Sequence, residues 1–569
     1  MWQKTVAYFL GIISSVAVTT PVLAADKIEF SYPPFGDFDI SIKDLELFVN
    51  EGKITKDFAF YANRATPEQL AQMRGFLGTK FQISPTVISQ FTYSPIGEKM
   101  LLRFGELLQT PNRINGFYAL RSALILSAAS PEGLTLMNIL KKYSSPSIRL
   151  NLSETTQIMG QLSELLQKRD IVVSQIQQIA NQEITNSPKI DFAQKLDIRQ
   201  TGDFQSNKIT LSIHDRSRDG KSKTVLERKY DVDVYLPQPK SATGTVSVPY
   251  PVIVISHGLA EDRNSFVYLA QHLASYGFVV ASLDHPVGNS QQFQQFLSGI
   301  ASPPQATELI ERPLDVKYLL NELQRLNETD PRLKNQLNLQ QVGIIGHSLG
   351  GYTALALAGG TFDFAKIRQE CNPNRSLNIS TFLQCRANDL QDDNYSIKDD
   401  RIKAVMVMNP LNSVLFGDKG ITTIPIPVMM VAATQDIFTP AVPEQIRPFS
   451  QLPSKDKYLA LIENATHFSV QSDLPTSESV IPVPQGLLGP DRKSVYSYMN
   501  ALGVAFFQTH LRDQPTYRPY LTSSYAQLIS QPPLNLSLVN SAHGLAISQL
   551  LNQLYSNLYP PDPNSKLRK

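Results

Sequence analysis

The sequence predicts an α/β fold in which helices cover both faces of a mostly parallel sheet. Between residues 205 and 512, short apolar runs alternate with helix-length segments, which is typical of parallel strands joined by crossover helices. At 569 residues the chain is too long for one ordinary domain. Helix-start signals and helical spacing over residues 26–145 predict a separate, all-helical N-terminal domain.

The charge and composition are those of a globular protein and argue against one class of partner. The formal net charge is +2, and the chain has no basic run interleaved with aromatic residues. Nucleic-acid binding depends on such a basic surface, so we expect no nucleic-acid partner.

The N-terminus has the three parts of a secretory signal peptide. Met1 to Lys4 is short and positively charged, Thr5 to Thr20 is apolar and uncharged, and Val22-Leu-Ala24 is a small-x-small cleavage pattern. We therefore expect residues 1–25 to be removed and the mature protein to be exported, into the periplasm or beyond the cell. The alternative is an uncleaved membrane anchor, although the apolar run is short for a membrane span.

The N-terminal domain begins its helices with clear capping signals. Thr66 is placed to cap a helix that opens with proline, and Ser94-Pro95 repeats this pattern. The region contains no histidine and no cysteine, so we interpret it as a cap or scaffold without chemistry of its own. Residues 150–185 have roughly helical spacing, so we expect residues 146–204 to be a linker made of one long helix or a helical hairpin.

The sheet is predicted strand by strand. Two alternating segments predict antiparallel strands at one edge, and six continuous apolar runs predict buried strands. The edge strands are expected at residues 208–213 and 229–236, and the buried strands at residues 250–256, 278–283, 342–345, 401–408, 427–433 and 457–462. The main helices of this region are expected at residues 265–276, 313–326 and 494–511.

Two segments depart from the alternation. Residues 361–400 lack periodicity and hold both cysteines, so they predict a lid-like insertion over the carboxyl edge of the sheet. In an exported protein, Cys371 and Cys385 can form a disulfide that closes a loop of about 14 residues and stabilises the fold by about 3 kcal/mol. Two free buried thiols are the alternative. Residues 513–569 predict a Pro-rich extension with one more helix.

The strongest chemical motif is Gly346-His-Ser-Leu-Gly350. It follows a β-branched apolar run and precedes a run of small residues, and this G-x-S-x-G pattern between a strand and a helix is typical of a nucleophile elbow. The glycines leave room for a tight turn that holds the serine hydroxyl above the sheet edge. Ser348 is therefore the predicted nucleophile, and the alternative is a Gly-rich turn with an incidental serine.

A serine nucleophile needs a general base, and the base needs an orienting acid. Asp436 directly follows one predicted strand and His467 follows the next, so nucleophile, acid and histidine stand in the chain order that such a sheet uses. Two backbone N–H groups should stabilise the oxyanion. We expect them at Leu349, after the nucleophile, and at Leu259, in the loop after the first buried strand.

Other acids and histidines are weaker candidates for these roles. Glu463 lies at the end of the strand that carries the histidine, Asp473 follows the histidine, and His347 is expected to point away from the site. A lone histidine is more often structural than catalytic. The remaining histidines are His214, His257, His272, His285, His510 and His543.

Residues 205–512 resemble the α/β-hydrolase superfamily, and within it the branch of platelet-activating-factor acetylhydrolases, lipases and dienelactone hydrolases. The residues that carry this resemblance are Ile255-Ser-His-Gly-Leu259, Tyr276-Gly-Phe-Val-Val-Ala281 with Asp284-His285, Arg312-Pro-Leu-Asp-Val-Lys-Tyr-Leu-Leu320 and Gly346-His-Ser-Leu-Gly-Gly351. The N-terminal region resembles an uncharacterised helical domain fused to such hydrolases in cyanobacteria. That second resemblance is carried by Gly52-Lys-Ile-Thr55, Gln90-Phe-Thr-Tyr93, Asn115-Gly-Phe-Tyr-Ala-Leu-Arg121 and Pro131-Glu-Gly-Leu-Thr135.

Together with the Ser348, Asp436 and His467 set, the resemblance implies a serine hydrolase that cleaves carboxylic esters through an acyl-enzyme, without a metal or organic cofactor, and the signal peptide implies that it is exported. A lipid-like ester is the expected substrate, as in lipases and phospholipid acetylhydrolases, and it would bring the protein into contact with a membrane surface. The helical domain and the insertion depart from that branch, so its acetyl-phospholipid specificity does not transfer. A polyesterase or peptidase on the same fold, and a non-catalytic binding module, are the alternatives. The sequence carries no signal for acyl-chain length, head group or oligomeric state.

Overall fold

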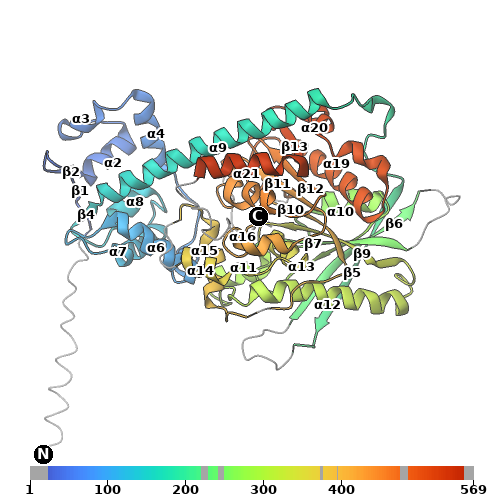
Figure 1. Cartoon of the computed structure of the whole chain (residues 1–569). Coiled ribbons are helices and arrows are strands. Elements are labelled where there is room, and N and C mark those ends of the chain that lie inside the picture. Colours follow the sequence, from blue (N-terminus) through green and yellow to red (C-terminus); the bar gives the residue numbers. More distant parts are fainter. Residues whose placement is uncertain are drawn as a thin grey trace, which may run out of the picture. The chain divides into compact units, whose positions relative to one another are not determined.

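The computed structural model describes residues 24–218, 228–240, 249–371, 376–393, 395–473 and 485–555 (Figure 1). The chain divides into two compact units, residues 1–160 and 161–569. The predicted signal peptide lies, except for its last two residues, outside the described part. Within the described ranges, no helix combines the length and the apolar character that a membrane span requires.

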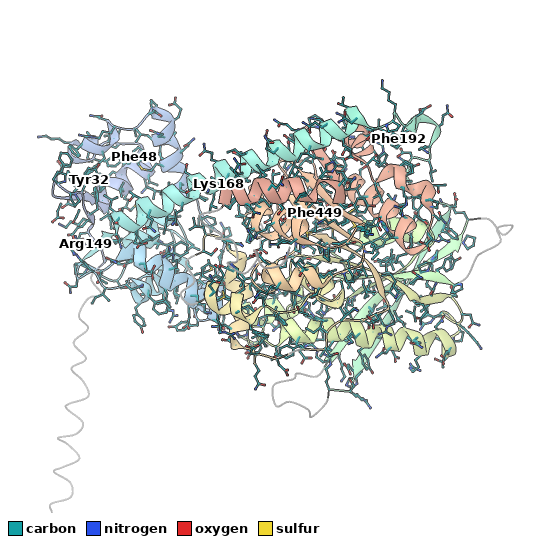
Figure 2. The ribbon with its side chains drawn as sticks, in the orientation of Figure 1. Tyr32, Phe48, Arg149, Lys168, Phe192 and Phe449 are labelled. Carbon is teal, nitrogen blue, oxygen red and sulfur yellow. A yellow bond between two sulfur atoms is a disulfide. The ribbon has the colours of Figure 1, made fainter. Side chains whose placement is uncertain are left out.

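The first unit is mostly helical, as expected. Thr66 caps its helix in a full capping box with Gln69, and the Ser94 hydroxyl accepts the N–H of Gly97, so both predicted helix starts are present. The helices are α2 (Ile42–Glu51), α3 (Lys56–Ala62), α4 (Pro67–Gly78), α5 (Pro85–Thr92), α6 (Pro95–Leu107), α7 (Phe117–Ala129) and α8 (Leu136–Lys141). Phe48, labelled in Figure 2, packs against Phe58 in the core of this unit with ring centroids 5.1 Å apart.

The prediction of an all-helical first domain is wrong, because the unit also contains a small sheet. Its strands lie in the order β2-β1-β4-β3. Their bounds are β1 (Lys27–Ser31), β2 (Asp37–Ser41), β3 (Leu108–Gln109) and β4 (Ser147–Leu150). Polar and apolar residues alternate along β1 and β2, which lets Phe30 stack on Phe38 across the pair. These strands are short, and helix signals on either side of them dominate the local pattern.

The predicted linker is one long helix and not a helical hairpin. Helix α9 (Leu152–Asn186) runs from the first unit into the second (Figure 1). Its later turns bury Val172, Ile176 and Ala180 in the core of the second unit. The spacing of these three residues, four apart, places them on one face of the helix.

The second unit is built on a nine-stranded sheet with the order β13-β12-β11-β10-β9-β7-β8-β6-β5. Strands β12 to β8 in this order are parallel, and the outer pairs are antiparallel. The bounds are β5 (Phe204–Asp215), β6 (Arg228–Pro239), β7 (Tyr250–Ser256), β8 (Val279–Leu283), β9 (Leu337–His347), β10 (Ile402–Met408), β11 (Val428–Ala433), β12 (Lys457–Ile462) and β13 (Leu536–Asn540). All eight predicted strands are therefore present, including the antiparallel edge pair.

Helices cover both faces of this sheet, as predicted. Along β7, Val252 and Val254 enter one core while Ile253 and Ile255 enter the other, because successive residues of a strand point to opposite faces. Helices α12 (Glu308–Thr329) and α13 (Leu349–Leu357) contribute to the first core, and α10 (Val267–Ser275) and α19 (Arg492–Leu511) to the second. The remaining helices are α11 (Ser290–Leu297), α14 (Phe364–Cys371), α15 (Ser380–Gln384), α16 (Gly417–Gly420), α17 (Arg447–Gln451), α18 (Gln485–Leu488), α20 (Ser523–Ile529) and α21 (Gly544–Tyr555).

The C-terminal segment is part of the sheet and not only a Pro-rich, helical extension. Strand β13 pairs antiparallel with β12 and completes the sheet edge, so a boundary at residue 512 is wrong. An unpaired β12 would leave a row of backbone groups without partners. Packing also ties this segment to the second unit: Phe192, labelled in Figure 2, contacts the rings of Tyr520 and Tyr525.

Candidate active site

Ser348 stands in the strained turn that the motif predicts. Strand β9 ends at His347 and α13 begins at Leu349, and Ser348 between them has φ 53° and ψ −117°. A positive φ in a non-glycine residue costs about 1–3 kcal/mol, and this strain lifts the side chain out of the turn. A Cβ on Gly346 would lie 2.1 Å from the Gly350 carbonyl oxygen, and one on Gly350 would lie 2.0 Å from the Ser256 carbonyl oxygen. Any side chain at Gly346 or Gly350 would therefore clash with the backbone, so both positions require glycine.

Asp436 and His467 come together at the same edge of the sheet. The loop after β11 carries Asp436 and the loop after β12 carries His467, and His467 Nδ1 lies 2.7 Å from Asp436 Oδ2. The carboxylate also accepts the backbone N–H groups of Phe438 and Thr439, each at 2.8 Å, and the Thr439 hydroxyl at 2.8 Å. Four hydrogen bonds therefore fix the orientation of the acid before any substrate arrives.

His467 lies next to the elbow. Its ring packs against that of His347, the neighbour of Ser348, with centroids 4.7 Å apart. The Ser348 N–H donates to the Met408 carbonyl, and Asn409, the next residue of that chain segment, donates to the His467 carbonyl at 3.3 Å. The three predicted residues thus lie at the carboxyl ends of the parallel strands β9, β11 and β12, on the same edge of the sheet.

The two predicted oxyanion donors belong to segments that adjoin the serine. A Cβ on Gly258 would lie 3.1 Å from the Ser348 Cβ, so the loop after β7 packs directly against the nucleophile. In that loop the N–H of Gly258 donates to Glu261, and the N–H of Ala260 donates to the Gly288 carbonyl. Within the described ranges the N–H of Leu259 has no assigned acceptor, nor does that of Leu349 in the first turn of α13.

Sequence reasoning missed Glu261 and was wrong about His347. His347 is fully buried and touches the site: its Nδ1 lies 2.6 Å from Glu261 Oε1, and its Nε2 lies 3.1 Å from the His467 carbonyl oxygen. Burial opposes the charged form of His347, but the adjacent carboxylate outweighs it and raises the pKa of His347 above its ordinary value. The pKa of Glu261 is lowered because the same pairing outweighs its own burial. The two residues are 86 positions apart in the sequence, so no local sequence pattern indicates that they interact.

The rival histidines and acids have other partners. His285 is buried beside Asp315 and Ser256, and burial lowers the pKa of His285 to about 3. Glu463 accepts a hydrogen bond from Asn535, and Asp473 pairs with Arg492. Within the described residues, no group of three or more His, Cys, Asp or Glu side chains is arranged to hold a metal ion.

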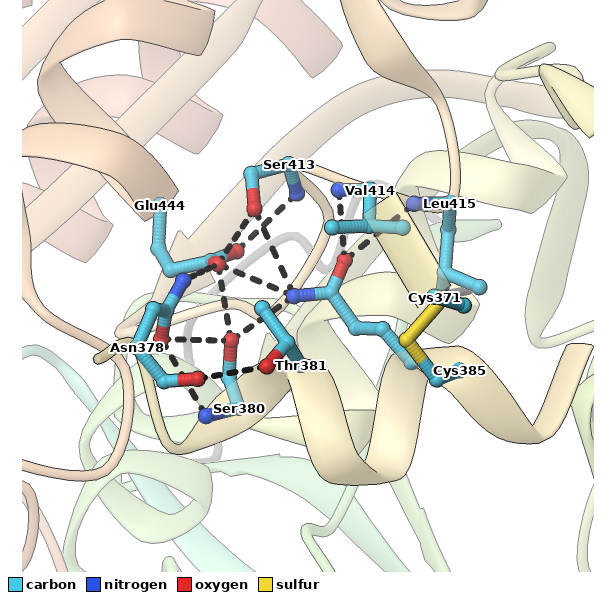
Figure 3. Close-up of a disulfide and its surroundings, with 10 residues drawn as sticks. Cys371, Asn378, Ser380, Thr381, Cys385, Ser413, Val414, Leu415 and Glu444 are labelled. Carbon is cyan, nitrogen blue, oxygen red and sulfur yellow. Dashed lines mark hydrogen bonds between the residues drawn. A yellow bond between two sulfur atoms is a disulfide. The ribbon is translucent and has the colours of Figure 1, made fainter. Parts of the chain in front are cut away.

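The predicted insertion is anchored to the segments that follow β10 and β11 (Figure 3). The Cys371–Cys385 disulfide joins the end of α14 to the residue that follows α15, with Cα atoms 5.5 Å apart, so the expected pairing is present. Beside it, Glu444 receives four side-chain hydrogen bonds, and two more from the backbone of the segment after β10. The side-chain donors are Asn378, Ser380, Gln384 and Ser413, and the backbone donors are Asn412 and Ser413. The described part of the insertion is therefore a fixed wall at the carboxyl edge.

Apolar side chains border the candidate site. The rings of Phe438 and Phe468 each lie 5.4 Å from the His467 ring and 5.4 Å from each other. Ile437, between Asp436 and Phe438, is 49% exposed. A substrate that reaches His467 would meet this apolar rim.

Comparisons with known proteins match separate parts of the chain. A family described as "Alpha/beta hydrolase of unknown function (DUF1400)" matches residues 24–151, and the chlorophyllase family matches residues 219–372, which include Ser348 but end before Asp436. The chain is 27% identical to "Platelet-activating factor acetylhydrolase" of Cavia porcellus over 135 residues, which are 19% of this chain and 31% of that protein. It is 22% identical to "Cutinase est1" of Thermobifida alba over 232 residues, which are 40% of this chain and 58% of that protein. The chain thus matches about a third to just over half of the length of these relatives.

Proposed function

Because the chain is a member of the α/β-hydrolase superfamily, we propose that it is an exported serine hydrolase of carboxylic esters. The observation that carries this proposal is the Asp436–His467 pair, 2.7 Å apart, beside a serine held at a positive φ. A binding module would have no need of this combination of strain, buried charge and fixed geometry.

In the proposed reaction, Ser348 Oγ attacks the ester carbonyl carbon while His467 Nε2 takes the serine proton. Asp436 holds the imidazole by its Nδ1 and stabilises the imidazolium that forms. The N–H groups of Leu259 and Leu349 donate to the oxyanion of the tetrahedral intermediate. His467 then returns the proton to the departing alkoxide, and water clears the acyl-enzyme by the same two steps.

We propose a lipid-like ester as the substrate. Phe438, Phe468 and the exposed Ile437 favour an apolar acyl group over a charged one. The names of the relatives, which include an acetylhydrolase and a cutinase, are consistent with ester bonds of different acyl groups. Contact with a membrane surface would follow from such a substrate.

We further propose export with removal of residues 1–25. The disulfide supports this, since such bonds persist in oxidising compartments. The proposed layout is a first domain that ends near residue 145, the α9 linker, and a hydrolase domain that includes β13 and the insertion at residues 361–400.

The test is fluorophosphonate labelling of the purified mature protein beside Ser348→Ala, followed by hydrolysis of p-nitrophenyl esters of increasing chain length. We expect labelling of the wild type, none of the variant, and a preference for longer acyl chains. A preference for acetyl esters would exclude the proposed long apolar acyl group, turnover of polyesters alone would replace the lipid-like substrate, and turnover of peptides alone would replace the ester class. A folded wild-type protein that neither labels nor turns over any ester would leave the binding-module alternative.

A further inference from the structure

We propose that Glu261 and His347 are positioning residues that hold the two sides of the proposed catalytic site together, an inference that rests on the proposed function. Glu261 fixes the loop that presents the oxyanion donor, and a doubly protonated His347 fixes the loop that carries the general base. Neither side chain is assigned a part in the reaction itself.

The first side of the connection is the loop after β7. Glu261 Oε2 accepts the N–H of Gly258 at 2.7 Å, one residue before the proposed donor Leu259. A Cβ on Gly258 would lie 2.6 Å from Glu261 Oε1 and 3.1 Å from the Ser348 Cβ, so carboxylate, loop and nucleophile are in direct contact. Glu261 therefore fixes the position of the backbone at Gly258 and Leu259 relative to Ser348.

The second side is the loop after β12. His347 Nε2 lies 3.1 Å from the carbonyl oxygen of His467, and that carbonyl also accepts the side-chain amide of Asn409. The backbone of the general base is thus held from two directions, which fixes the position from which its imidazole reaches Ser348.

The partners of His347 determine its protonation. Nδ1 faces a carboxylate oxygen and Nε2 faces a carbonyl oxygen, and both of these atoms can only accept hydrogen bonds. A neutral imidazole carries a single N–H and would leave one acceptor facing a lone pair. Only the imidazolium satisfies both, so the connection between the two loops exists while His347 is protonated and is lost as pH rises through its raised pKa.

The surroundings of the pair contain few other charges. Asp436 and His467 face His347, and the ring of Phe266 packs beside it at 5.6 Å. His467 and Arg312 also act on Glu261, and Gln471 donates to Glu261 Oε1 at 2.6 Å. Glu261 supplies the largest favourable interaction with the His347 cation.

The test compares Glu261→Gln and His347→Gln with the wild type over pH 6 to 10, measuring kcat and KM on the best ester. Gln at 261 keeps an acceptor for Gly258 but loses the charge. We expect kcat to fall about 10- to 100-fold with KM changed less than about twofold, since misplacement of reacting groups by up to about 1 Å has this effect. We also expect the alkaline limb of kcat to move to lower pH in Glu261→Gln and to be absent in His347→Gln.

The matched control is His272→Gln. His272 is also buried and also bonds a backbone carbonyl, that of Ile198 at 3.0 Å, but it has no carboxylate partner in the described ranges and lies on α10, away from the site. Circular dichroism and thermal unfolding report the folded fraction of each variant. A fall in kcat no larger than in the control, or an alkaline limb that does not move, would overturn the proposal.

The pH dependence of kcat in the wild type provides a further test, and no folding defect of a variant can affect it. A kcat that stays level from pH 7 to 10 would contradict a required His347 cation. Failure of the proposed function has a different signature, because the wild type itself would then neither label nor hydrolyse esters. An active wild type with an inactive Ser348→Ala and a fully active Glu261→Gln would overturn this inference and leave the proposed function standing.

Discussion

The carboxylate of Asp436 and the imidazole of His467 lie 2.7 Å apart although 31 residues separate them in the chain. The loops after the adjacent parallel strands β11 and β12 lie at the same edge of the sheet. The backbone N–H groups of Phe438 and Thr439 donate to the Asp436 carboxylate. The acid is thereby committed to one histidine nitrogen, which selects the tautomer in which Nε2 is free to accept a proton.

Asp436→Asn should therefore lower kcat by about 10⁴-fold with little change in KM. The asparagine amide would donate to His467 Nδ1 and force the proton onto Nε2, which then cannot act as a base. Kinetics on a soluble p-nitrophenyl ester would measure this. Glu463→Gln, at the rival acid, should retain wild-type kcat, and the reverse ranking of the two variants would contradict the assignment.

Gly258→Ala should reduce kcat by about tenfold or more, because the added methyl would displace the Glu261 carboxylate and press on Ser348. The fold should survive, since the closest atom is the end of a side chain and not backbone. Gly75→Ala is the matched change in open space, where no atom lies within 4 Å of the new Cβ. That variant should unfold at a slightly higher temperature, since alanine favours a helix by about 0.5–1 kcal/mol. Equal activity of the two variants would contradict close packing of the loop on the nucleophile.

Removal of the disulfide by Cys371→Ser with Cys385→Ser should reduce the free energy of unfolding by about 3 kcal/mol. Activity at 25 °C should persist, because the Glu444 hydrogen bonds hold the same segment independently. Thermal unfolding with and without a reducing agent measures the effect. The reductant should destabilise the wild type only, and a variant as stable as the wild type would mean that the bond does not form in solution.

Glu444→Gln should destabilise the protein by several kcal/mol, since it replaces an acceptor of six hydrogen bonds with a group that is half donor. Oε1 accepts all four side-chain donors and Oε2 accepts both backbone donors, so an amide nitrogen in either place would leave at least two donors facing an N–H, and each unsatisfied buried group costs about 1–3 kcal/mol. Urea unfolding would measure the loss. Glu370→Gln, on the exposed side of α14, is the control and should be close to neutral.

Lys457 should make the wild type more stable as pH rises from 7 to 9. It is 6% exposed at the start of β12, and its ammonium donates to the Ser450 and Leu452 carbonyls near the ring of Phe449, labelled in Figure 2. Burial lowers the pKa of Lys457 to about 8, below that of an unfolded lysine, so folding releases a proton in this window and stability increases with pH. The wild type should gain about 1 kcal/mol relative to Lys457→Met between these values in urea unfolding. Parallel pH curves for the two proteins would refute this.

The central sheet and the three catalytic candidates could be predicted because each is indicated by residues that are close together in the sequence. Buried strands such as β7 and β10 are continuous apolar runs, and Ser348, Asp436 and His467 each follow one of them. The sheet of the first unit was harder to predict, because β1 and β2 are five residues each and adjoin stronger helix signals. Strand β13 is equally short, and its place is set by pairing with β12, which lies far back in the chain.

The Glu261–His347 pair could not be predicted from the sequence for a different reason. Glu261 belongs to a loop and His347 to the variable position of a motif, and neither position has a periodicity or spacing that indicates its partner. Only the parallel pairing of β7 with β9 brings the two together. Contacts of this kind are decided by topology, so sequence patterns predict the candidate catalytic residues but not the residues that hold them in place.

The position of β13 has a consequence for how the protein is made. Strand β12, whose following loop carries His467, stays at an open edge until residues 536–540 have been synthesised, so a chain that stops before that point displays an unpaired strand beside the proposed general base. The segment after residue 512 is therefore needed to close this edge of the sheet, and a chain cut before residue 536 should expose β12 to pairing with strands of other molecules.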